Sequence, residues 1–437
     1  MKNTKILVLI LVVTLLSTYL VACQPQTPQL VDYVSQLTLD MNTDTLKQEV
    51  TVRNYIDGDT THFDVPKTVS STGVLKARYL AINTPESTGM IEPYGKAASN
   101  FTKEKLKSAV SIIVESDNNK WNIDSTGDRF LVWVWYQPAE GQPYRNLNLE
   151  ILQEGLAVGS NTQANRYGDI CMSALTQAQN SKLKVFSGEP DPDMYYGSAI
   201  EMTLKELRLN IEEYNNKKVA FEGVISMDDG GSAWIEEFDQ ETGVYFGITV
   251  YYGNSGLTST GLDILQMGNR VRIVGTVQYW EAGGTYQISG LKYNLREPND
   301  PDNIQKISDG HSAAYPLVSA DQFAHGTVYI EQAEGNDATL AYAEAVVDTS
   351  ISMNGLTVKS VYTTQEGDSA GAMTLTCQAE DGTTISVRTA VFKNADGTLM
   401  TEADYLGKTI NVKGFVSYFS GSYQINVLAP KYVTIVS

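Results

Sequence analysis

The strongest constraint on the fold is an internal repeat in the second half of this 437-residue chain. Residues 271–280 and 410–419 share one pattern, in which an apolar strand is interrupted by a glycine, Gly275 or Gly414, and ends in two aromatic residues. A glycine turn and another strand follow in both copies. Because each copy has the make-up of one supersecondary unit, the repeat predicts two tandem β-rich modules.

Two short segments rich in proline and aspartate divide the chain. They span residues 187–193 and 296–302, and their prolines prevent a helix or a central strand from continuing through them. The length of the chain independently suggests about three domains. We therefore expect a first domain over residues 46–187, followed by modules over residues 198–297 and 312–437.

The short strands and glycine turns of the two modules resemble the OB-fold, a small closed barrel without exposed strand edges. The fold class expected for the whole chain is mainly β with some α (α+β).

Charge is distributed unevenly between the two halves. Residues 189–437 carry 15 Lys and Arg against 33 Asp and Glu, whereas residues 51–188 carry 14 of each. A groove that follows a nucleic-acid backbone needs positive charge. A spacer or protein-contact role is thus favoured for the modules. Nucleic-acid binding is supported only by their paired aromatic residues, which could stack on bases. Calcium binding by the acidic modules is a further alternative, which rests on charge alone because no EF-hand loop is present.

The first residues read as an export signal. A short segment with two lysines precedes an apolar run over residues 6–22, which predicts a signal rather than part of the fold. Small residues lead into Cys23, as in a bacterial lipobox, so residues 1–22 are expected to be removed and Cys23 lipidated, with residues 23–45 as a linker. A plain signal peptide and a transmembrane anchor are the alternatives. The predicted location is extracytoplasmic, at the membrane through Cys23.

The two other cysteines do not form a disulfide framework. Cys171 lies in an apolar run and Cys377 in an alternating strand pattern, so both are expected to be core thiols. A cysteine nucleophile or a zinc site is disfavoured.

Oxygen-bearing side chains gather at the ends of one predicted hairpin. Two strand-like runs between Asp59 and Asn83 are joined by a turn-like stretch of serine, threonine and glycine. Antiparallel pairing would place Asp59 opposite Asn83. Thr84 and Glu86 follow at once, around a proline that stiffens the chain. Oxygen ligands of this kind suit calcium or magnesium rather than zinc.

Two arginines complete a set suited to phosphodiester hydrolysis. Arg78 lies inside the second strand of the hairpin, and Arg129 opens a later apolar strand. In such chemistry a metal neutralises a phosphate oxygen, a carboxylate takes a proton from water, and planar guanidinium groups hold the charge of the transition state.

These residues form an ordered set of separated motifs. The motifs are Asp57-Gly58-Asp59-Thr60, Arg78, Asn83-Thr84-Pro85-Glu86, residues 92–98 and Arg129. Together they resemble the staphylococcal nuclease (thermonuclease) family, and residues 148–157 resemble its helix-and-turn segment. The resemblance covers residues 48–187.

The resemblance implies an OB barrel with three helices that acts as a calcium-dependent endonuclease on DNA and RNA, with little sequence preference. It implies calcium ligation by the side chains of Asp59 and Asn83 and by the carbonyl of Thr84. It further implies that Glu86 is the general base and that Arg78 and Arg129 bind the phosphate.

The chain departs from the family pattern in three places. Asn83 stands where the family usually has an aspartate, so weaker calcium binding is expected. The loop over residues 87–91 is shorter and lacks the family's lysines. Asp128 lies beside Arg129, where it could pair with the guanidinium and blunt it.

Two functional hypotheses follow. The leading one is a surface nuclease that degrades extracellular DNA or RNA. The alternative is a catalytically weakened nuclease fold that binds nucleic acid or a protein at the cell surface, supported by Asn83 and by the acidic second half.

Overall fold

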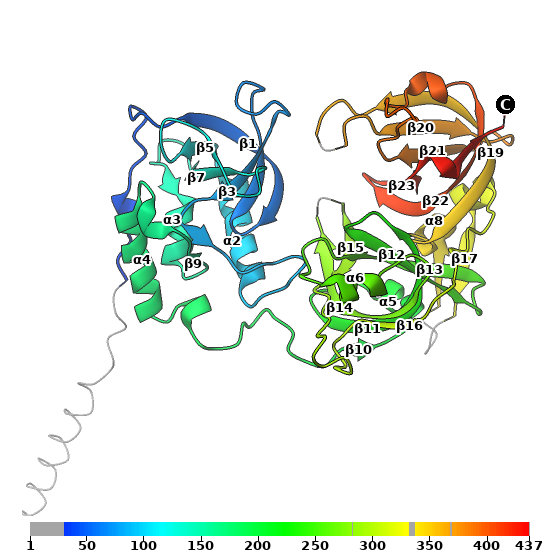
Figure 1. The fold of residues 1–437 in the computed structure, drawn as a ribbon, viewed down its shortest axis with the longest axis horizontal. Helices are drawn as coiled ribbons and strands as arrows, with labels where there is room; N and C mark the ends of the chain where they lie inside the picture. Colours follow the sequence, from blue (N-terminus) through cyan, green and yellow to red (C-terminus); the bar gives the residue numbers. More distant parts are fainter. Residues whose placement is uncertain (1–29, 282, 332–336, 368, 437) are drawn as a thin grey trace, which may run out of the picture.

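The computed structural model describes residues 30–281, 283–331, 337–367 and 369–436. Within these residues the chain folds into three β-barrels with one shared connectivity (Figure 1). In each barrel the first strand pairs antiparallel with the second and the fourth, and the third pairs in parallel with the fifth. The expected β-rich α+β fold with barrels of the OB type is confirmed.

The first barrel is built from five main strands. These are β1 (Lys47–Asp57), β2 (Thr60–Asp64), β3 (Val74–Tyr79), β5 (Ser111–Ser116) and β7 (Phe130–Gln137), with the two-residue strands β4 (Ile82–Asn83), β6 (Asn122–Ile123), β8 (Arg145–Asn146) and β9 (Val158–Gly159). Large apolar side chains such as Phe63, Leu75, Trp133 and Trp135 are fully buried. Their burial is the main favourable term for this barrel.

Three α-helices accompany the first barrel. They are α2 (Gly95–Ser108), α3 (Leu147–Gln153) and α4 (Gly168–Asn180), and short 3-10 turns lie at Val34–Gln36, Thr162–Ala164 and Lys184–Phe186. Helix α3 begins where the Oδ1 of Asn146 accepts a hydrogen bond from the backbone N–H of Leu149 at 2.9 Å, which satisfies one of the free N–H groups of the first turn. Helices α3 and α4 pack on each other.

The second barrel, which we call module 1, follows a linker. It contains β10 (Ile200–Glu201), α5 (Leu204–Leu209), β11 (Lys218–Asp228), β12 (Ser232–Asp239), β13 (Val244–Tyr251), α6 (Ser259–Ile264), β14 (Arg270–Trp280), β15 (Thr285–Ser289) and β16 (Gln305–Ser308). Helix α5 starts with a capping box between Thr203 and Glu206. Its apolar residues Leu204 and Leu207 are buried in the core of the module.

The third barrel, module 2, repeats this plan. It contains α7 (Ala320–His325), β17 (Thr327–Ile330), β18 (Ala338–Ala341), α8 (Tyr342–Ala345), β19 (Ser350–Thr363), β20 (Met373–Gln378), β21 (Thr384–Thr389), β22 (Thr409–Phe419), β23 (Ser422–Val427) and β24 (Val433–Ile435), with 3-10 turns at Glu402–Asp404 and Pro430–Tyr432. The repeated sequence pattern forms the hairpin β14–β15 in one module and β22–β23 in the other.

The cores of the two modules are continuous. Buried apolar residues of both belong to a single cluster, and the rings of Trp234 and Phe415 lie 4.3 Å apart at the junction. A buried carboxylate also crosses it, because Glu236 of module 1 accepts hydrogen bonds from Ala314 and Ser350. The two modules therefore pack as one unit.

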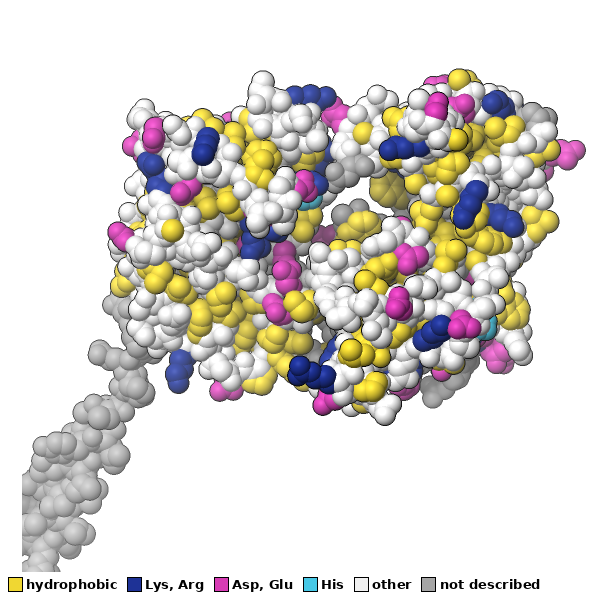
Figure 2. Space-filling model, in the orientation of Figure 1, with side chains coloured by type: hydrophobic (Ala, Val, Ile, Leu, Met, Phe, Trp, Pro, Cys, Tyr) yellow, Lys and Arg dark blue, Asp and Glu magenta, His cyan; other side chains and the backbone are white. Residues whose placement is uncertain are grey.

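The first barrel contacts both modules, and the three barrels surround an opening that is visible in the space-filling view (Figure 2). Lys67 forms an ion pair of 2.9 Å with Glu366 of module 2, and Lys103 pairs with Glu281 of module 1. Side chains of both charge signs border the opening in Figure 2.

Cys171 and Cys377 are free and buried, as expected of core thiols. The expected signal peptide and Cys23 lie outside the described residues. None of the helices in the described part of the chain is both long and apolar enough to cross a membrane.

Candidate active site

Arg78 of β3 joins two of the predicted site residues. Its two terminal nitrogens donate hydrogen bonds to Oδ1 of Asp59 and Oδ1 of Asn83. Asp59 is only 1% exposed, and its Oδ2 accepts a hydrogen bond from the backbone N–H of Thr84 at 2.9 Å. Burial raises the pKa of Asp59 above its usual range, against the opposing charge of Arg78. Four of the predicted residues are thus in one hydrogen-bonded group.

The hairpin register differs from the one expected. The backbone N–H of Tyr79, not Asn83, lies opposite Asp59 and donates to its carbonyl at 2.9 Å. Strand β3 ends at Tyr79, because Ala81 takes a left-handed conformation with φ of 69° that turns the chain into β4. Strand β4 pairs with β9 instead of extending the hairpin. Asn83 still joins the group, through its side chain.

Asp57 holds the turn and the loop that carries Glu86. Its Oδ1 accepts hydrogen bonds of 2.7 Å from the backbone N–H of Gly58 and from the hydroxyl of Ser87. Burial and a hydrogen bond with the Glu86 carboxyl raise the pKa of Asp57 to about 8. The two carboxyl groups are therefore adjacent, and burial favours the neutral form of Asp57.

The backbone around Glu86 is fixed by the start of helix α2. The carbonyl of Glu86 accepts from the N–H of Glu92 at 2.9 Å, and its N–H donates to the Glu92 carboxylate at 3.0 Å. A Cβ at Gly95 would lie 2.2 Å from the Glu86 carbonyl oxygen, so only glycine permits this close approach. The hydroxyl of Thr102 on α2 donates to the carbonyl of Gly58 at 2.6 Å. Helix α2 thus anchors both the Asp59 turn and the Glu86 loop.

Arg129 precedes β7, which pairs in parallel with β3 next to Arg78. Its guanidinium contacts Asp124, with Nε at 2.7 Å and a terminal nitrogen at 2.6 Å from Oδ2. Burial alone would raise the pKa of the Asp124 carboxyl. Hydrogen bonds from Thr126 and Arg129 outweigh it, so the pKa lies below its usual value.

Asp128, which could have paired with the neighbouring Arg129, instead has a different partner. Asp128 pairs at 3.0 Å with Lys76 on the adjacent strand. The reason is the turn between Asp124 and Arg129. The backbone N–H of Asp124 donates a hydrogen bond of 2.9 Å to the carbonyl of Arg129, and this closed turn brings the Asp124 side chain to the guanidinium.

The donor set suits a hard divalent cation. Asp59, Asn83 and the carbonyl of Thr84 offer oxygen atoms only, the ligands that calcium and magnesium prefer. The hydroxyl oxygen of Thr84 is buried and lacks a hydrogen-bond partner among the described residues, so an oxygen beside Asp59 is left unsatisfied. No group of three or more His, Cys, Asp or Glu in the described ranges has an arrangement suited to a metal. The set of Asp59, Asn83 and Thr84 is not such a group, since two of its oxygens come from an amide and a backbone carbonyl.

Sequence reasoning missed Tyr251 of module 1. Burial raises the pKa of Tyr251, and the charges of Asp229 and then of Glu86 act in the same direction. No local motif marks Tyr251, since it lies about 165 residues beyond Glu86 in a different barrel.

Comparisons with known proteins agree with the geometry of the first barrel. The family model described as "Staphylococcal nuclease homologue" matches residues 76–187. A thermonuclease from Staphylococcus intermedius is 30% identical over 149 residues, an alignment that covers 33% of this chain and 80% of the relative. The family model therefore matches the first barrel and its helices, and it ends before module 1 begins.

Proposed function

This chain belongs to the staphylococcal nuclease family, and from that premise we propose that its first barrel hydrolyses phosphodiester bonds of DNA or RNA, with calcium as the required ion and little sequence preference. The observation that carries the proposal is the group of Asp59, Arg78, Asn83 and Thr84, which is linked by hydrogen bonds, with Glu86 two residues after Thr84. A family nuclease needs these functional groups at one place.

Each side chain has a defined task in the proposed reaction. The Glu86 carboxylate accepts a proton from the attacking water. The guanidinium groups of Arg78 and Arg129 donate planar pairs of hydrogen bonds to the phosphate and stabilise the charge that builds on it. Calcium held by Asp59, Asn83 and the Thr84 carbonyl would supply positive charge beside a phosphate oxygen.

Arg78 links metal binding to phosphate binding. Its nitrogens contact the same oxygens of Asp59 and Asn83 that are proposed as metal ligands. If these oxygens were to hold a cation, the Arg78 donors would be free for the phosphate. The proposal therefore predicts that calcium and substrate bind cooperatively.

A cleavage assay tests the proposal. Purified residues 24–437 are incubated with plasmid DNA, single-stranded DNA and RNA at millimolar calcium, with and without a chelator. We expect cleavage that the chelator abolishes. If none of the three polymers is cut at millimolar calcium, the nuclease proposal is wrong.

We also propose that the chain is exported and tethered to the outer face of the membrane through lipid on Cys23. The support is the order of charged, apolar and small residues before this cysteine. Labelling of cells with a fatty-acid analogue should modify the wild type but not Cys23→Ala, which should be released into the medium. An unlabelled wild type would refute lipidation.

A binding role is the second candidate, because both arginines are engaged by carboxylates, Arg78 by Asp59 and Arg129 by Asp124. Glu86→Gln separates the two functions. Loss of cleavage with retained binding of nucleic acid supports catalysis, whereas binding without cleavage in the wild type as well as in Glu86→Gln supports the binding role.

A further inference from the structure

Module 1 holds the loop that follows the candidate general base. The Nε2 of Gln278 on β14 donates a hydrogen bond of 2.7 Å to the carbonyl of Ser87. The backbone N–H of Gly290 donates a hydrogen bond of 2.7 Å to the carbonyl of Gly89. Two carbonyls of the 87–91 loop are therefore satisfied by a different barrel.

Glycines on both sides allow this close approach. Gly89 has φ of 74°, and a Cβ there would lie 2.8 Å from Asn254 of module 1. Gly290 has φ of 70°, and a Cβ there would lie 3.0 Å from a methyl carbon of Ile91. Either position tolerates only glycine without movement of its neighbour.

Ser87 is held from two directions. Its hydroxyl donates to Asp57 of the first barrel at 2.7 Å, while its carbonyl accepts from Gln278 of module 1. Glu86 is the preceding residue, so the path of its backbone depends on both contacts. A general base contributes only when its carboxylate is aimed at the water, and a displacement of about 1 Å can lower the rate on the order of a hundredfold.

The contact belongs to module 1 and has no copy in module 2. In the hairpin β14–β15, Thr276 pairs with Ser289, and in β22–β23, Phe415 pairs with Asn426. Thr276 and Phe415 are therefore equivalent positions, and Gln278 and Ser417, each two residues later, correspond to each other. In module 1 the Oε1 of Gln278 accepts from the hydroxyl of Ser289. In module 2, Ser417 Oγ and Asn426 Oδ1 are buried without a partner among the described residues. The two copies thus differ where module 1 touches the loop.

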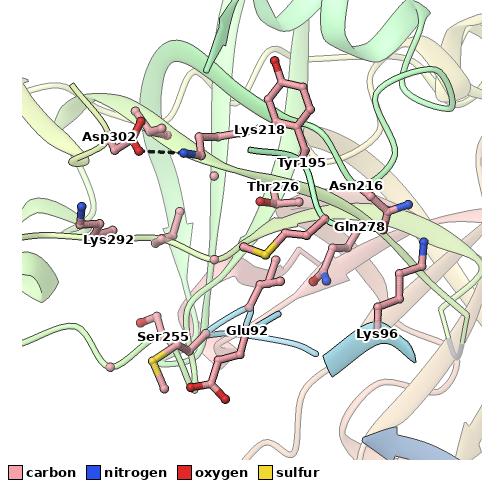
Figure 3. A pocket seen from close by; sticks show the side chains of 18 of the residues that line it. Glu92, Lys96, Tyr195, Asn216, Lys218, Ser255, Thr276, Gln278, Lys292 and Asp302 are labelled. Atoms are coloured by element: carbon pink, nitrogen blue, oxygen red, sulfur yellow. Dashed lines mark hydrogen bonds and ion pairs between the residues drawn. The ribbon is translucent and has the colours of Figure 1, made fainter. Parts of the chain in front are cut away.

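A cavity of about 490 Å³ lies beside this contact, between Glu92 and Lys96 of the first barrel and Thr276 and Gln278 of module 1 (Figure 3). The two barrels are therefore not packed continuously along this interface. Module 1 reaches the loop through the hydrogen bonds from Gln278 and Gly290, and of these two the one from Gln278 is the nearer to Glu86 in the sequence.

From these contacts we propose that module 1 is part of the catalytic unit, and that Gln278 is a positioning residue that holds the 87–91 loop so that Glu86 is aligned with Asp59. This inference rests on the proposed nuclease function. It assigns to the acidic first module the role of ordering the active-site loop, rather than that of a spacer.

The test compares three variants of purified residues 24–437. Gln278→Ala removes the donor, Gln278→Glu keeps the length of the side chain but places a carboxylate against the Ser87 carbonyl, and Ser417→Ala alters the corresponding position of module 2. Hydrogen exchange of the amides of residues 86–92 is measured with kcat, KM and Tm. For both Gln278 variants we expect faster exchange in this segment, a kcat lower by about tenfold, a KM within about twofold of wild type and a Tm within about 2 °C. Ser417→Ala should match the wild type in exchange and kcat.

Exchange that is unchanged in residues 86–92 of Gln278→Ala overturns the inference, as does faster exchange spread evenly over the chain. Exchange is read without substrate, so it decides the positioning role even if the wild type cuts no polymer. In that case the nuclease proposal fails separately.

Discussion

Glu236 of module 1 accepts a hydrogen bond of 2.6 Å from the backbone N–H of Ser350, the first residue of β19 in module 2. The hydroxyl of Ser350 and the N–H of Ala314 donate to its other oxygen, each at 2.9 Å. Glu236 is 2% exposed. A single carboxylate therefore satisfies three donors at the junction of the two modules.

We expect Glu236→Ala to destabilise the modules by about 2–4 kcal/mol, because it leaves buried donors without an acceptor. Glu236→Gln, which keeps one acceptor oxygen, should cost less. Urea unfolding measures both, and a change below about 0.5 kcal/mol in Glu236→Ala would contradict the role of this carboxylate.

The pH dependence of the same variants has a defined sign. Burial raises the pKa of Glu236 above its usual value, although hydrogen bonds from Ala314 and Ser350 oppose the shift. A raised folded-state pKa means that stability declines as pH rises from the unfolded value of 4.5 through the folded one. Glu236→Gln should lack this decline, which unfolding measured across that range would show.

Arg129 is expected to need its planar guanidinium and not merely its charge. Arg129→Lys should lower kcat/KM at least about tenfold, because an ammonium group cannot make the paired hydrogen bonds to phosphate. Asp128→Asn is the matched control. It breaks only the partly exposed pair with Lys76, so we expect kcat/KM within about twofold of wild type and stability within about 0.5 kcal/mol. A large loss of activity in Asp128→Asn would refute the assignment of Asp124 as the partner of Arg129.

Asn83→Asp should strengthen calcium binding. The substitution adds a negative charge to an oxygen donor set, and calcium affinity rises with the number of charged ligands. We expect the calcium concentration for half-maximal cleavage to fall by about tenfold, on the order of 1.4 kcal/mol. An unchanged or higher calcium requirement would show that Asn83 is not a ligand.

Asp57 should make the stability of the metal-free protein depend on pH. Its carboxyl has its usual pKa of 3.8 in the unfolded chain, whereas burial, and then Glu86, raise the pKa of the folded group to about 8. Stability should therefore fall as pH rises through this window and level off above it. In chelator, Asp57→Asn should show a smaller fall than wild type between these limits. Parallel curves for the two proteins would contradict the raised pKa.

Local sequence predicted the first barrel well, because its motifs are short and its chemistry is close in the chain. Asp59, Arg78, Asn83 and Thr84 are brought together within 26 residues by one hairpin and the turn after it, so their grouping needs little long-range information. The register was mispredicted because the left-handed turn at Ala81 ends β3 early, and alanine gives no sign of such a turn.

Pairings of charged side chains were less predictable. Adjacency in sequence suggested Asp128 for Arg129, but both residues lie in the turn between β6 and β7, outside either strand. Asp128 faces Lys76, and the tight turn brings Asp124 to the guanidinium.

The sequence by itself determined the three β-rich units, the tandem repeat and the set of oxygen and guanidinium groups, because hydrophobic period, glycine turns and motif order are local properties. Only the tertiary structure decided that Gln278 and Gly290 contact the loop that follows Glu86. That choice depends on how separate barrels dock, through hydrogen bonds to backbone carbonyls that leave no pattern within either segment.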